Sequence, residues 1–300
     1  MSVLAPPVVS VIIPLYNSEE YINDTIQSVV SQTYKDWELI VVDDCYTDNS
    51  RDIVKNVAQI DERIKLLELD NNFGGPAVPR NIGIKKSKGK YVAFLDSDDL
   101  WHKEKLEVCL KYFDSNVDIV YHDLLRFGKV NFLSKRRMKG RKLKRPVIID
   151  LLMNGNGISN SSVIARANII KSVGCLNESK KMIAAEDYNL WLKISEVTDN
   201  FLHIPKELGR YLIGDDNISK KDMSNCSKEA SVDFENFLTK SELLKYTARL
   251  MYEQGRYFYI NKEYYSAQKY LYKSIRFGKV NIQIKSLYML CIVYFRRLNV

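Results

Sequence analysis

The sequence lacks the cysteine spacing that marks a zinc site or a disulfide framework. Its five cysteines are scattered along 300 residues without a CxxC pair, at positions 45, 109, 175, 226 and 291. Structural zinc sites and small secreted domains both depend on closely spaced cysteines. We therefore exclude both classes and expect a protein of a reducing cytoplasm. Histidine is scarce as well, and the three that occur show no ligand spacing, so we interpret them as structural (His102, His122 and His203).

Long apolar runs are also missing. No stretch reaches the roughly 18 uncharged apolar residues that a membrane-spanning helix needs. The first residues, MSVLAPPVVSVIIPLY, carry no basic segment ahead of a short apolar run, unlike a signal peptide. We expect a protein that is soluble or peripheral to a membrane.

Two common nucleotide-binding motifs do not occur. There is no GxxxxGK[ST], and no GxGxxG follows a predicted strand. The first motif holds phosphates in P-loop proteins, and the second holds dinucleotides at a strand-to-helix turn. Both of those classes are therefore excluded.

The sequence does contain ample apolar material and an uneven distribution of charge. Hydrophobic residues make up 46% of the chain, enough for a catalytic domain with a buried core. The net charge of +8 divides into 10 Lys/Arg against 16 Asp/Glu in residues 1–100 (−6), 18 against 11 in 101–200 (+7) and 17 against 10 in 201–300 (+7). This asymmetry favours a chelating site in the first third and an anionic partner for the remainder, against the alternative of an uneven solvated surface.

The first part of the chain alternates predicted strands and helices. Runs rich in β-branched residues indicate strands buried on both faces, and apolar residues at helical spacing follow them. An N-cap at Asn17 with Glu20 three residues later predicts the start of the first helix. This rhythm predicts an α/β fold with a doubly wound, mainly parallel sheet. We expect strands at 8–16, 37–44, 64–70 and 91–96, and helices at 50–59 and 77–88.

Polar residues follow three of these strands directly. They are the stretch 14–17, the pair Asp43 and Asp44, and the group Asp96, Asp98 and Asp99. Carboxyl ends of parallel strands share one edge of the sheet, where ligands bind. Carboxylates about 4 Å apart repel by roughly 4 kcal/mol at an effective dielectric near 20, and a divalent cation relieves that repulsion. An oxygen-only ligand set suits Mg²⁺ or Mn²⁺, which usually brings phosphate with it, so we predict a nucleotide diphosphate held by carboxylates and metal.

At this point the sequence resembles a known family. The stretches VSVIIPLYNSEEYINDTIQSVVSQTY, WELIVVDDCYTDNS, GGPAVPRNIGIKKSKGKYVAFLDSDD and AAEDYNLWLKI are similar to four motifs of the family 2 inverting glycosyltransferases, which have the GT-A nucleotide-diphospho-sugar transferase fold. The resemblance covers roughly residues 8–220. It implies a donor nucleotide sugar, a divalent metal and an acceptor hydroxyl.

The resemblance implies roles for the residues at the strand ends. Asp98 matches the metal ligand of the family's D-x-D element, with Asp96 beside it as a second ligand that faces the ribose or the diphosphate. Asp43 and Asp99 are supporting residues: Asp43 shapes a turn, whereas Asp99 either supports the metal or caps a helix beginning at Leu100. Arg80 meets a phosphate or pairs with the acidic residues. The residues expected to contact the nucleotide sugar are Pro14, Tyr16, Asp44, Arg80, Asp96 and Ser97.

Two acidic residues later in the chain match the family's catalytic element. Inversion at an anomeric carbon needs a base that takes the proton of the acceptor hydroxyl. By resemblance Asp187 is that base, and Glu186 orients it or the acceptor. The structural alternative is that the two acidic residues lie at a helix N-terminus and interact favourably with the helix dipole. The family's Y-R-x-H-x-x-S pattern is broken further on, where Leu212 and Gly214 replace its arginine and histidine.

The remainder of the chain predicts the acceptor side and an accessory segment. KRRMKGRKLKR (135–145) has eight basic residues in eleven and is either a solvated loop or a contact for anionic lipid or a lipid diphosphate. Residues 253–281 resemble one tetratricopeptide hairpin, and 287–298 either packs or lies on a membrane. The predicted domains are 1–224, with a nucleotide-sugar half at about 8–100 and an acceptor half at 101–224, and a helical segment at 225–300.

The expected function is metal-dependent, inverting transfer of a hexose from a UDP-sugar. The resemblance implies an undecaprenyl-diphosphate-linked saccharide as acceptor, a β-linkage in O-antigen or capsule assembly, and a peripheral location on the inner face of the cytoplasmic membrane. No nucleic acid partner is expected, and the oligomeric state is not predicted. A sugar-phosphate nucleotidyltransferase needs a Gly-rich loop where PLYNSEE stands, and a degenerate scaffold needs broken D-x-D or ED elements, whereas both are intact.

Overall fold

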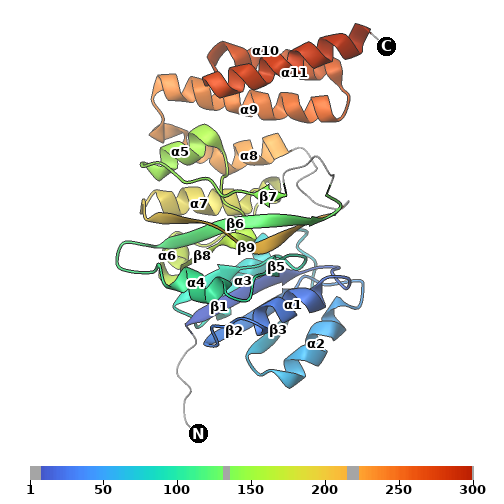
Figure 1. Ribbon diagram of the computed structural model, residues 1–300, viewed down its shortest axis with the longest axis vertical. Coiled ribbons are helices and arrows are strands. Elements are labelled where there is room, and N and C mark those ends of the chain that lie inside the picture. Colours follow the sequence, from blue (N-terminus) through green and yellow to red (C-terminus); the bar gives the residue numbers. More distant parts are fainter. Residues whose placement is uncertain (1–7, 131–135, 215–222, 299–300) are drawn as a thin grey trace. The chain divides into compact units, whose positions relative to one another are not determined.

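The computed structural model describes residues 8–130, 136–214 and 223–298 (Figure 1). The chain forms two compact units by contact, residues 1–143, 157–180 and 196–215 in the first and 144–156, 181–195 and 216–300 in the second. The strands are β1 Val9–Leu15, β2 Trp37–Asp43, β3 Ile64–Glu68, β4 Tyr91–Phe94, β5 Leu100–Trp101, β6 Ile119–Gly128, β7 Arg137–Met138, β8 Ile164–Arg166 and β9 Phe201–Ile213. The α-helices are α1 Ile22–Val30, α2 Ser50–Ile60, α3 Ala77–Lys86, α4 Lys105–Leu110, α5 Val147–Asn154, α6 Ala167–Ser172, α7 Glu186–Ser195, α8 Met223–Ser231, α9 Lys240–Ile260, α10 Tyr264–Phe277 and α11 Val280–Leu298, and the 3₁₀ turns are η1 Asn160–Ser162, η2 Lys180–Met182 and η4 Val232–Phe237.

The first unit is built on one sheet with the strand order β3-β2-β1-β4-β8-β6-β9-β5, and β7 pairs with β6. The strands β3, β2, β1 and β4 are parallel neighbours, as predicted. Beyond β4 the sheet is mixed, because β8 runs antiparallel to both β4 and β6 while β6 and β9 are parallel. Figure 1 shows β6 and β9 side by side as long ribbons. The predicted α/β fold is confirmed.

Close packing of helices on the parallel strands fixes where these strands end. Strands β1 and β2 are almost wholly buried. Their β-branched and leucine residues place apolar side chains on both faces of the sheet, as strands buried on both faces require. Helix α3 approaches them through Gly83, where an added Cβ would lie 2.7 Å from Ile12. The carboxyl ends of β1, β2 and β4 consequently have fixed positions at one edge of the sheet.

Two local predictions at helix starts were wrong. Helix α1 begins at Ile22, and its N-cap Tyr21 makes no side-chain capping bond, so Asn17 and Glu20 form no capping box. Asn17 instead has a φ of 45° and exchanges hydrogen bonds with Thr47 in the loop after β2, 2.8 Å in each direction. A long-range loop contact has replaced the local cap that the sequence favours.

No helix begins at Leu100 either. Leu100 and Trp101 form strand β5, which pairs with Arg210 and Gly209 of β9, and the next helix begins at Lys105. The interpretation of Asp99 as a helix cap is therefore wrong. Pairing with a strand more than 100 residues away leaves no local signal in the sequence.

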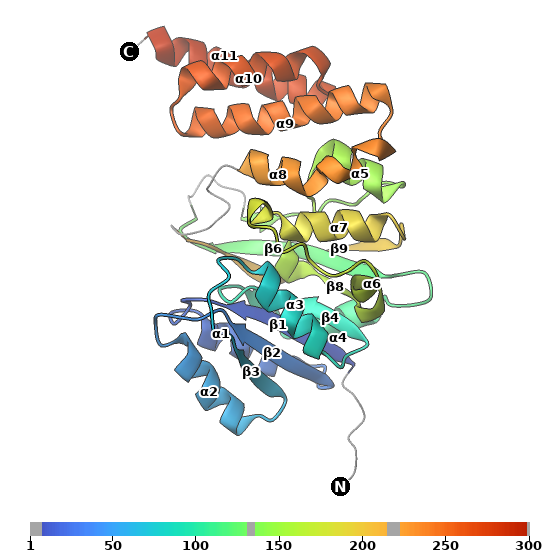
Figure 2. The same cartoon turned by 180° about the vertical axis from the view of Figure 1, so that it is seen from behind.

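The second unit is helical. It combines α5 and α7 with α8 to α11, and the C-terminal helices α9, α10 and α11 pack side by side (Figure 2). Gly255 of α9 lies against Leu271 of α10, where an added Cβ would come within 2.9 Å of its Cγ. Within the described ranges, no helix combines the length and apolar character needed to cross a membrane. The predicted boundary at residue 224 stays a prediction.

Candidate active site

The ends of β1, β2 and β4 meet at one edge of the first unit. Ser18, after β1, shares a 2.7 Å hydrogen bond with Ser97, after β4. Thr25 of α1 donates to the carbonyl oxygen of Ser97 at 3.0 Å. The predicted convergence of the loops after β1 and β4 is therefore confirmed, and the acidic loop (Asp96–Asp99) lies at this edge.

Two of the residues predicted to contact the nucleotide sugar belong to β1 and the loop after it. Pro14 is part of β1, in register with Val42 of β2, and Tyr16 follows the strand with 48% of its surface exposed. An exposed aromatic ring at a strand end is available to stack on a ligand. The role of both residues at a nucleotide base stays a prediction.

The neighbouring aspartates at the end of β2, Asp43 as its last residue and Asp44 just after it, differ in their partners. Asp43 is buried and accepts hydrogen bonds from Arg51 at 2.5 and 2.8 Å, so its carboxylate is bound to α2. Asp44 accepts a hydrogen bond from the backbone N–H of Phe73 at 2.9 Å. Burial raises the pKa of both carboxyl groups, and the partners of each oppose that shift. The Arg51 contact fits a turn-shaping role for Asp43.

Asp96 is held from two sides. Arg80, itself buried, donates to its Oδ1 at 2.6 Å, and Asn160 of η1 donates to the same oxygen at 3.0 Å. Of the two alternatives for Arg80, the structure shows the contact with the acidic loop. A buried guanidinium fixed on Asp96 also lowers the net charge of this loop.

The surroundings of Asp98 disfavour its ionised form. Burial and then the neighbouring Asp96 raise its pKa to about 6. Asp99 is 1% exposed, accepts a hydrogen bond from the backbone N–H of Leu212 at 3.0 Å, and has a pKa raised well above its usual value by burial and by Asp98 and Asp96. The crowding of three carboxyl groups is therefore a real feature of this edge.

The turn η1 holds the acidic loop through hydrogen bonds. The sequence did not predict this support. The hydroxyl of Ser161 accepts a hydrogen bond from the backbone N–H of Asp96 at 3.1 Å and also bonds to the side chain of Asp99. The carbonyl of Ser161 in turn accepts from the ammonium of Lys105 and the indole of Trp101, both at 2.9 Å. Lys105 is fully buried and lies 3.4 Å from the Trp101 ring centroid.

Sequence patterns gave no reason to single out these supporting residues. Lys105 is the first residue of α4, a position where a lysine is usually exposed to solvent. Here burial lowers its pKa well below the usual value. Asn160 and Ser161 lie in a polar loop whose role the sequence does not define. Their contacts join segments more than 50 residues apart, and such contacts have no sequence periodicity.

Glu186 and Asp187, the predicted acceptor-side residues, belong to the second unit. They open α7, and Glu186 is buried whereas Asp187 is partly exposed. Asp187 accepts hydrogen bonds from the N–H of Tyr188 at 2.6 Å and from Asn156 at 3.2 Å. Helix α7 is anchored by the Tyr188 hydroxyl, which donates to the carbonyl of Leu151 in α5 at 2.9 Å. Of the two carboxylates, Asp187 is the one with solvent access.

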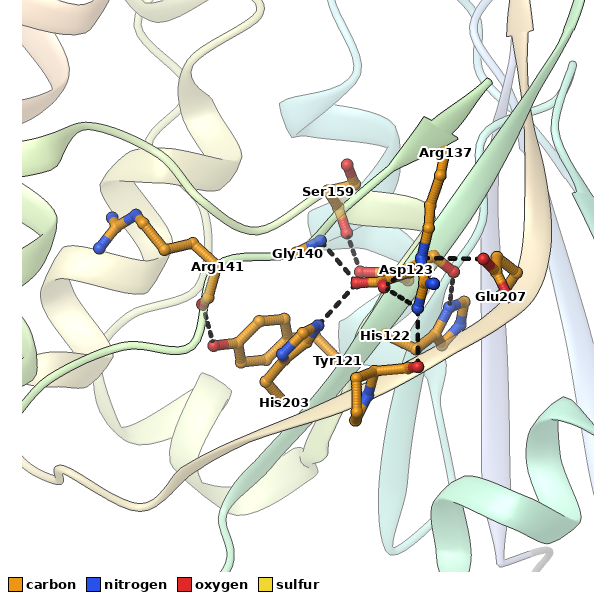
Figure 3. Close-up of polar contacts among 11 residues, drawn as sticks. Tyr121, His122, Asp123, Arg137, Gly140, Arg141, Ser159, His203 and Glu207 are labelled. Carbon is orange, nitrogen blue, oxygen red and sulfur yellow. Dashed lines mark hydrogen bonds and ion pairs between the residues drawn. The ribbon is translucent and has the colours of Figure 1, made fainter. Parts of the chain in front are cut away.

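The basic segment (136–145, since Lys135 lies outside the described residues) is anchored to the first unit through Asp123 of β6 (Figure 3). The carboxylate of Asp123 bonds to Arg137 at 2.9 Å, to the N–H of Gly140 at 2.8 Å and to His203 at 2.7 Å. Burial opposes ionisation, but these hydrogen bonds hold the pKa of Asp123 below its usual value.

A further anchor lies beside this cluster. The Tyr121 hydroxyl donates to the carbonyl of Arg141 at 2.5 Å, and the Tyr121 ring stacks on His203 (Figure 3). His203 is thus structural, as predicted. The exposed basic side chains of the segment 136–145 are Arg136, Lys139, Lys142, Lys144 and Arg145. The segment is therefore a basic surface on a fixed backbone.

The donor set at the strand ends fits a divalent cation. The side chains there that could bind a cation are carboxylates, and within the described part of the chain no three His, Cys, Asp or Glu residues form a metal cluster by themselves. Mg²⁺ is commonly held by one or two carboxylates, with phosphate and water oxygens completing its shell. Asp98 and Asp96 match that pattern.

Comparison with known proteins gives a family match and several relatives. Residues 10–168, just over half of the chain, match the family model described as Glycosyl transferase family 2. TuaG of Bacillus subtilis, a putative teichuronic acid biosynthesis glycosyltransferase, is 52% identical over 106 residues, which are 35% of this chain and 42% of TuaG. The match thus spans less than half the length of that relative.

A second relative and a solved structure match over longer stretches. WfgD of Escherichia coli, named UDP-Glc:alpha-D-GlcNAc-diphosphoundecaprenol beta-1,3-glucosyltransferase, is 34% identical over 189 residues, which are 62% of this chain and 69% of WfgD. Residues 1–349 of S. aureus TarS in complex with UDP superpose with a TM-score of 0.67 and 20% identity, covering 96% of this chain and 91% of that chain. At this identity the superposition bears on the fold alone.

Proposed function

The chain belongs to glycosyl transferase family 2, and from that premise we propose that it transfers a hexose from a UDP-sugar to a hydroxyl of a lipid-diphosphate-linked saccharide, with inversion. The observation that carries the proposal is the acidic loop, fixed at the carboxyl edge of three parallel strands by Arg80, Asn160 and Ser161. The name of WfgD supports UDP-glucose as donor class and an undecaprenol diphosphate as acceptor carrier.

The donor residues have distinct proposed tasks. Asp98 binds Mn²⁺ or Mg²⁺, with Asp96 beside it, and the bound cation would neutralise charge that develops on the leaving diphosphate. Asp44 and Tyr16 receive the base, and Ser97 borders the donor. Because Leu212 and Gly214 provide no cationic side chain and Arg80 is paired with Asp96, the bound cation would supply most of the positive charge in this proposal.

The proposed transfer step needs one general base to take the proton of the acceptor hydroxyl. The acceptor oxygen forms a bond to the anomeric carbon as the bond between that carbon and the diphosphate oxygen breaks. The acceptor proton moves to the carboxylate of Asp187, and UDP leaves. Attack on the face opposite the diphosphate inverts the anomeric centre, so an α-linked UDP-hexose gives a β-linked product. The partly exposed position of Asp187 at the first turn of α7 supports this assignment.

A donor and acceptor panel tests the proposed function. The protein is incubated with UDP-glucose, UDP-galactose and their N-acetyl forms, a synthetic saccharide diphospholipid and Mn²⁺ or Mg²⁺. We expect one UDP-sugar to add a single hexose, detected by mass spectrometry, with a β-linkage by NMR. Absence of transfer from every UDP-sugar, or an α-linked product from an α-linked donor, would contradict the proposal.

A pair of buried serines in η1 tests the support of the acidic loop. Ser161→Ala removes the acceptor for the Asp96 N–H and a partner of Asp99, whereas Ser162→Ala removes only a bond to the carbonyl of Ser159. We expect each variant to lose about 1 kcal/mol of unfolding free energy. Only Ser161→Ala should also weaken Mn²⁺-dependent UDP binding, by about tenfold in calorimetry.

The comparison between the two serine variants decides the point. Since both hydroxyls are buried in the same turn, a general loosening of η1 would lower UDP affinity equally in the two variants. Equal affinities would show that Ser161 stabilises the fold without positioning the acidic loop.

A further inference from the structure

The C-terminal helices α10 and α11 carry positive charge without any compensating acidic residue. From Tyr264 to Val300 the sequence contains no Asp or Glu. A folded surface usually intersperses both signs, so one sign over so long a stretch points to an anionic partner. The seven basic residues of this stretch are Lys269, Lys273, Arg276, Lys279, Lys285, Arg296 and Arg297.

Among its described side chains, helix α11 has two apolar faces, one packed inside the second unit and one exposed. Met289 and Val293 are buried against Ala267 and Leu271 of α10. The opposite side, which we call the α11 outer face, has large apolar side chains at helical spacing that are 51–68% exposed. They are Ile284, Leu287, Tyr288, Tyr294 and Phe295, and the exposed Cys291 lies between them.

Basic residues flank the α11 outer face. Lys285 lies near its start, and Arg296 follows Phe295 at its end, where its guanidinium lies 3.4 Å from the Tyr264 hydroxyl. Aliphatic and aromatic residues framed by Lys and Arg are typical of helices that lie in the membrane interface. No described helix is suited to span a bilayer, so the fitting geometry is a helix lying in the plane.

We propose that the α11 outer face binds an anionic lipid surface, with Ile284, Leu287 and Phe295 entering the headgroup region and Lys285 and Arg296 contacting the phosphates. The inference rests on the proposed function, in which the acceptor is held in a membrane by its lipid. Each basic residue near an anionic leaflet contributes attraction that salt screens. A second copy is a poorer occupant, since two such faces would bring like charges together.

Vesicle co-sedimentation of the full chain tests this inference. Phosphatidylcholine vesicles are compared with vesicles that also contain phosphatidylglycerol, at low and high salt. Leu287→Gln/Phe295→Gln removes apolar contact without changing charge, and Lys285→Gln/Arg296→Gln removes charge. The control is Ile60→Gln/Val197→Gln, which changes two exposed apolar residues of the first unit, again without changing charge.

We expect the wild type and the control to bind the anionic vesicles and to release them at high salt. Each α11 variant should bind at least tenfold more weakly, with an unchanged Tm because the altered side chains are exposed. Binding that is absent in the wild type, or equal in all variants, would overturn the inference. A shift from dimer to monomer in the α11 variants, seen by light scattering without vesicles, would assign the face to a second copy and overturn it too.

Activity separates this inference from the proposed function. Both α11 variants should retain UDP binding and transfer to a water-soluble, short-chain acceptor. If the wild type transfers the sugar but does not bind vesicles, the membrane inference alone is overturned. Vesicle binding by the wild type without transfer to any acceptor would overturn the proposed function alone.

Discussion

Asp98→Asn is expected to abolish Mn²⁺-dependent binding of UDP and to lower kcat/KM for the donor by about 10²–10³-fold, the range seen when one electrostatic contact to developing charge is removed. The substitution keeps the size of the side chain but removes the anionic ligand. Asp96 alone is not expected to replace it, because Arg80 and Asn160 donate to its Oδ1 and leave only Oδ2 for the cation. Isothermal calorimetry with UDP, with and without Mn²⁺, measures the effect directly.

Stability is expected to move in the other direction. Burial and the neighbouring Asp96 raise the pKa of Asp98 from 3.8 to about 6, which means that the ionised carboxylate is destabilised in the folded protein. Replacing it by a neutral amide removes that cost, so the Tm of the metal-free protein should stay or rise. A variant that is at least as stable as the wild type yet does not bind UDP with Mn²⁺ cannot be explained by misfolding.

A matched control is available at the other edge of the sheet. Glu62→Gln also neutralises one carboxylate of the first unit, but it lies in the exposed turn before β3, at the amino end of the parallel strands. We expect its UDP affinity to equal that of the wild type. If Asp98→Asn binds UDP with the same Mn²⁺ dependence as Glu62→Gln, Asp98 is not the metal ligand.

Family, fold and glycosyltransferase activity were predictable because they depend on patterns within short segments. The sequence shows the apolar runs of β1 and β2 and the polar residues that follow them. Parallel pairing then brings the strand ends together. The family match and the glycosyltransferase relatives confirm these predictions. The roles of the individual site residues, the linkage and the acceptor stay proposals.

What escaped prediction depends on contacts between distant segments. The difference between Asp43 and Asp44 is set by Arg51 and by the backbone of Phe73, and neither partner follows from the strand pattern. Asp99 resembles a helix cap locally, but its bond to Leu212 exists only because β5 pairs with β9. Lys105 is buried with its ammonium group donating to the carbonyl oxygen of Ser161 in η1 and lying over the ring of Trp101. Each case needs a partner whose position the local sequence does not contain.

Asp187→Asn is expected to reduce turnover by about 10²–10⁴-fold, the contribution typical of a general base, while UDP and Mn²⁺ binding stay as in the wild type. The amide keeps the shape of the side chain, and its oxygen can still accept the hydrogen bond from the Tyr188 N–H. Single-turnover kinetics with the saccharide diphospholipid, beside calorimetry with UDP, separate the loss of chemistry from any loss of donor binding.

The competing role for Asp187 is a negative charge at the N-terminus of α7, which would contribute about 0.3–1 kcal/mol to stability and nothing to the reaction. Asp187→Glu distinguishes the two roles, because it keeps the charge on the first turn but moves the carboxylate by one methylene. As a base, the glutamate should remain slow, since proton transfer requires hydrogen-bond distance to the acceptor oxygen. If Asp187 acts only on the helix dipole, the glutamate should keep both Tm and turnover at the wild-type level. Full activity in Asp187→Glu together with near-wild-type turnover in Asp187→Asn would remove Asp187 from the reaction and leave the acceptor proton without its proposed base.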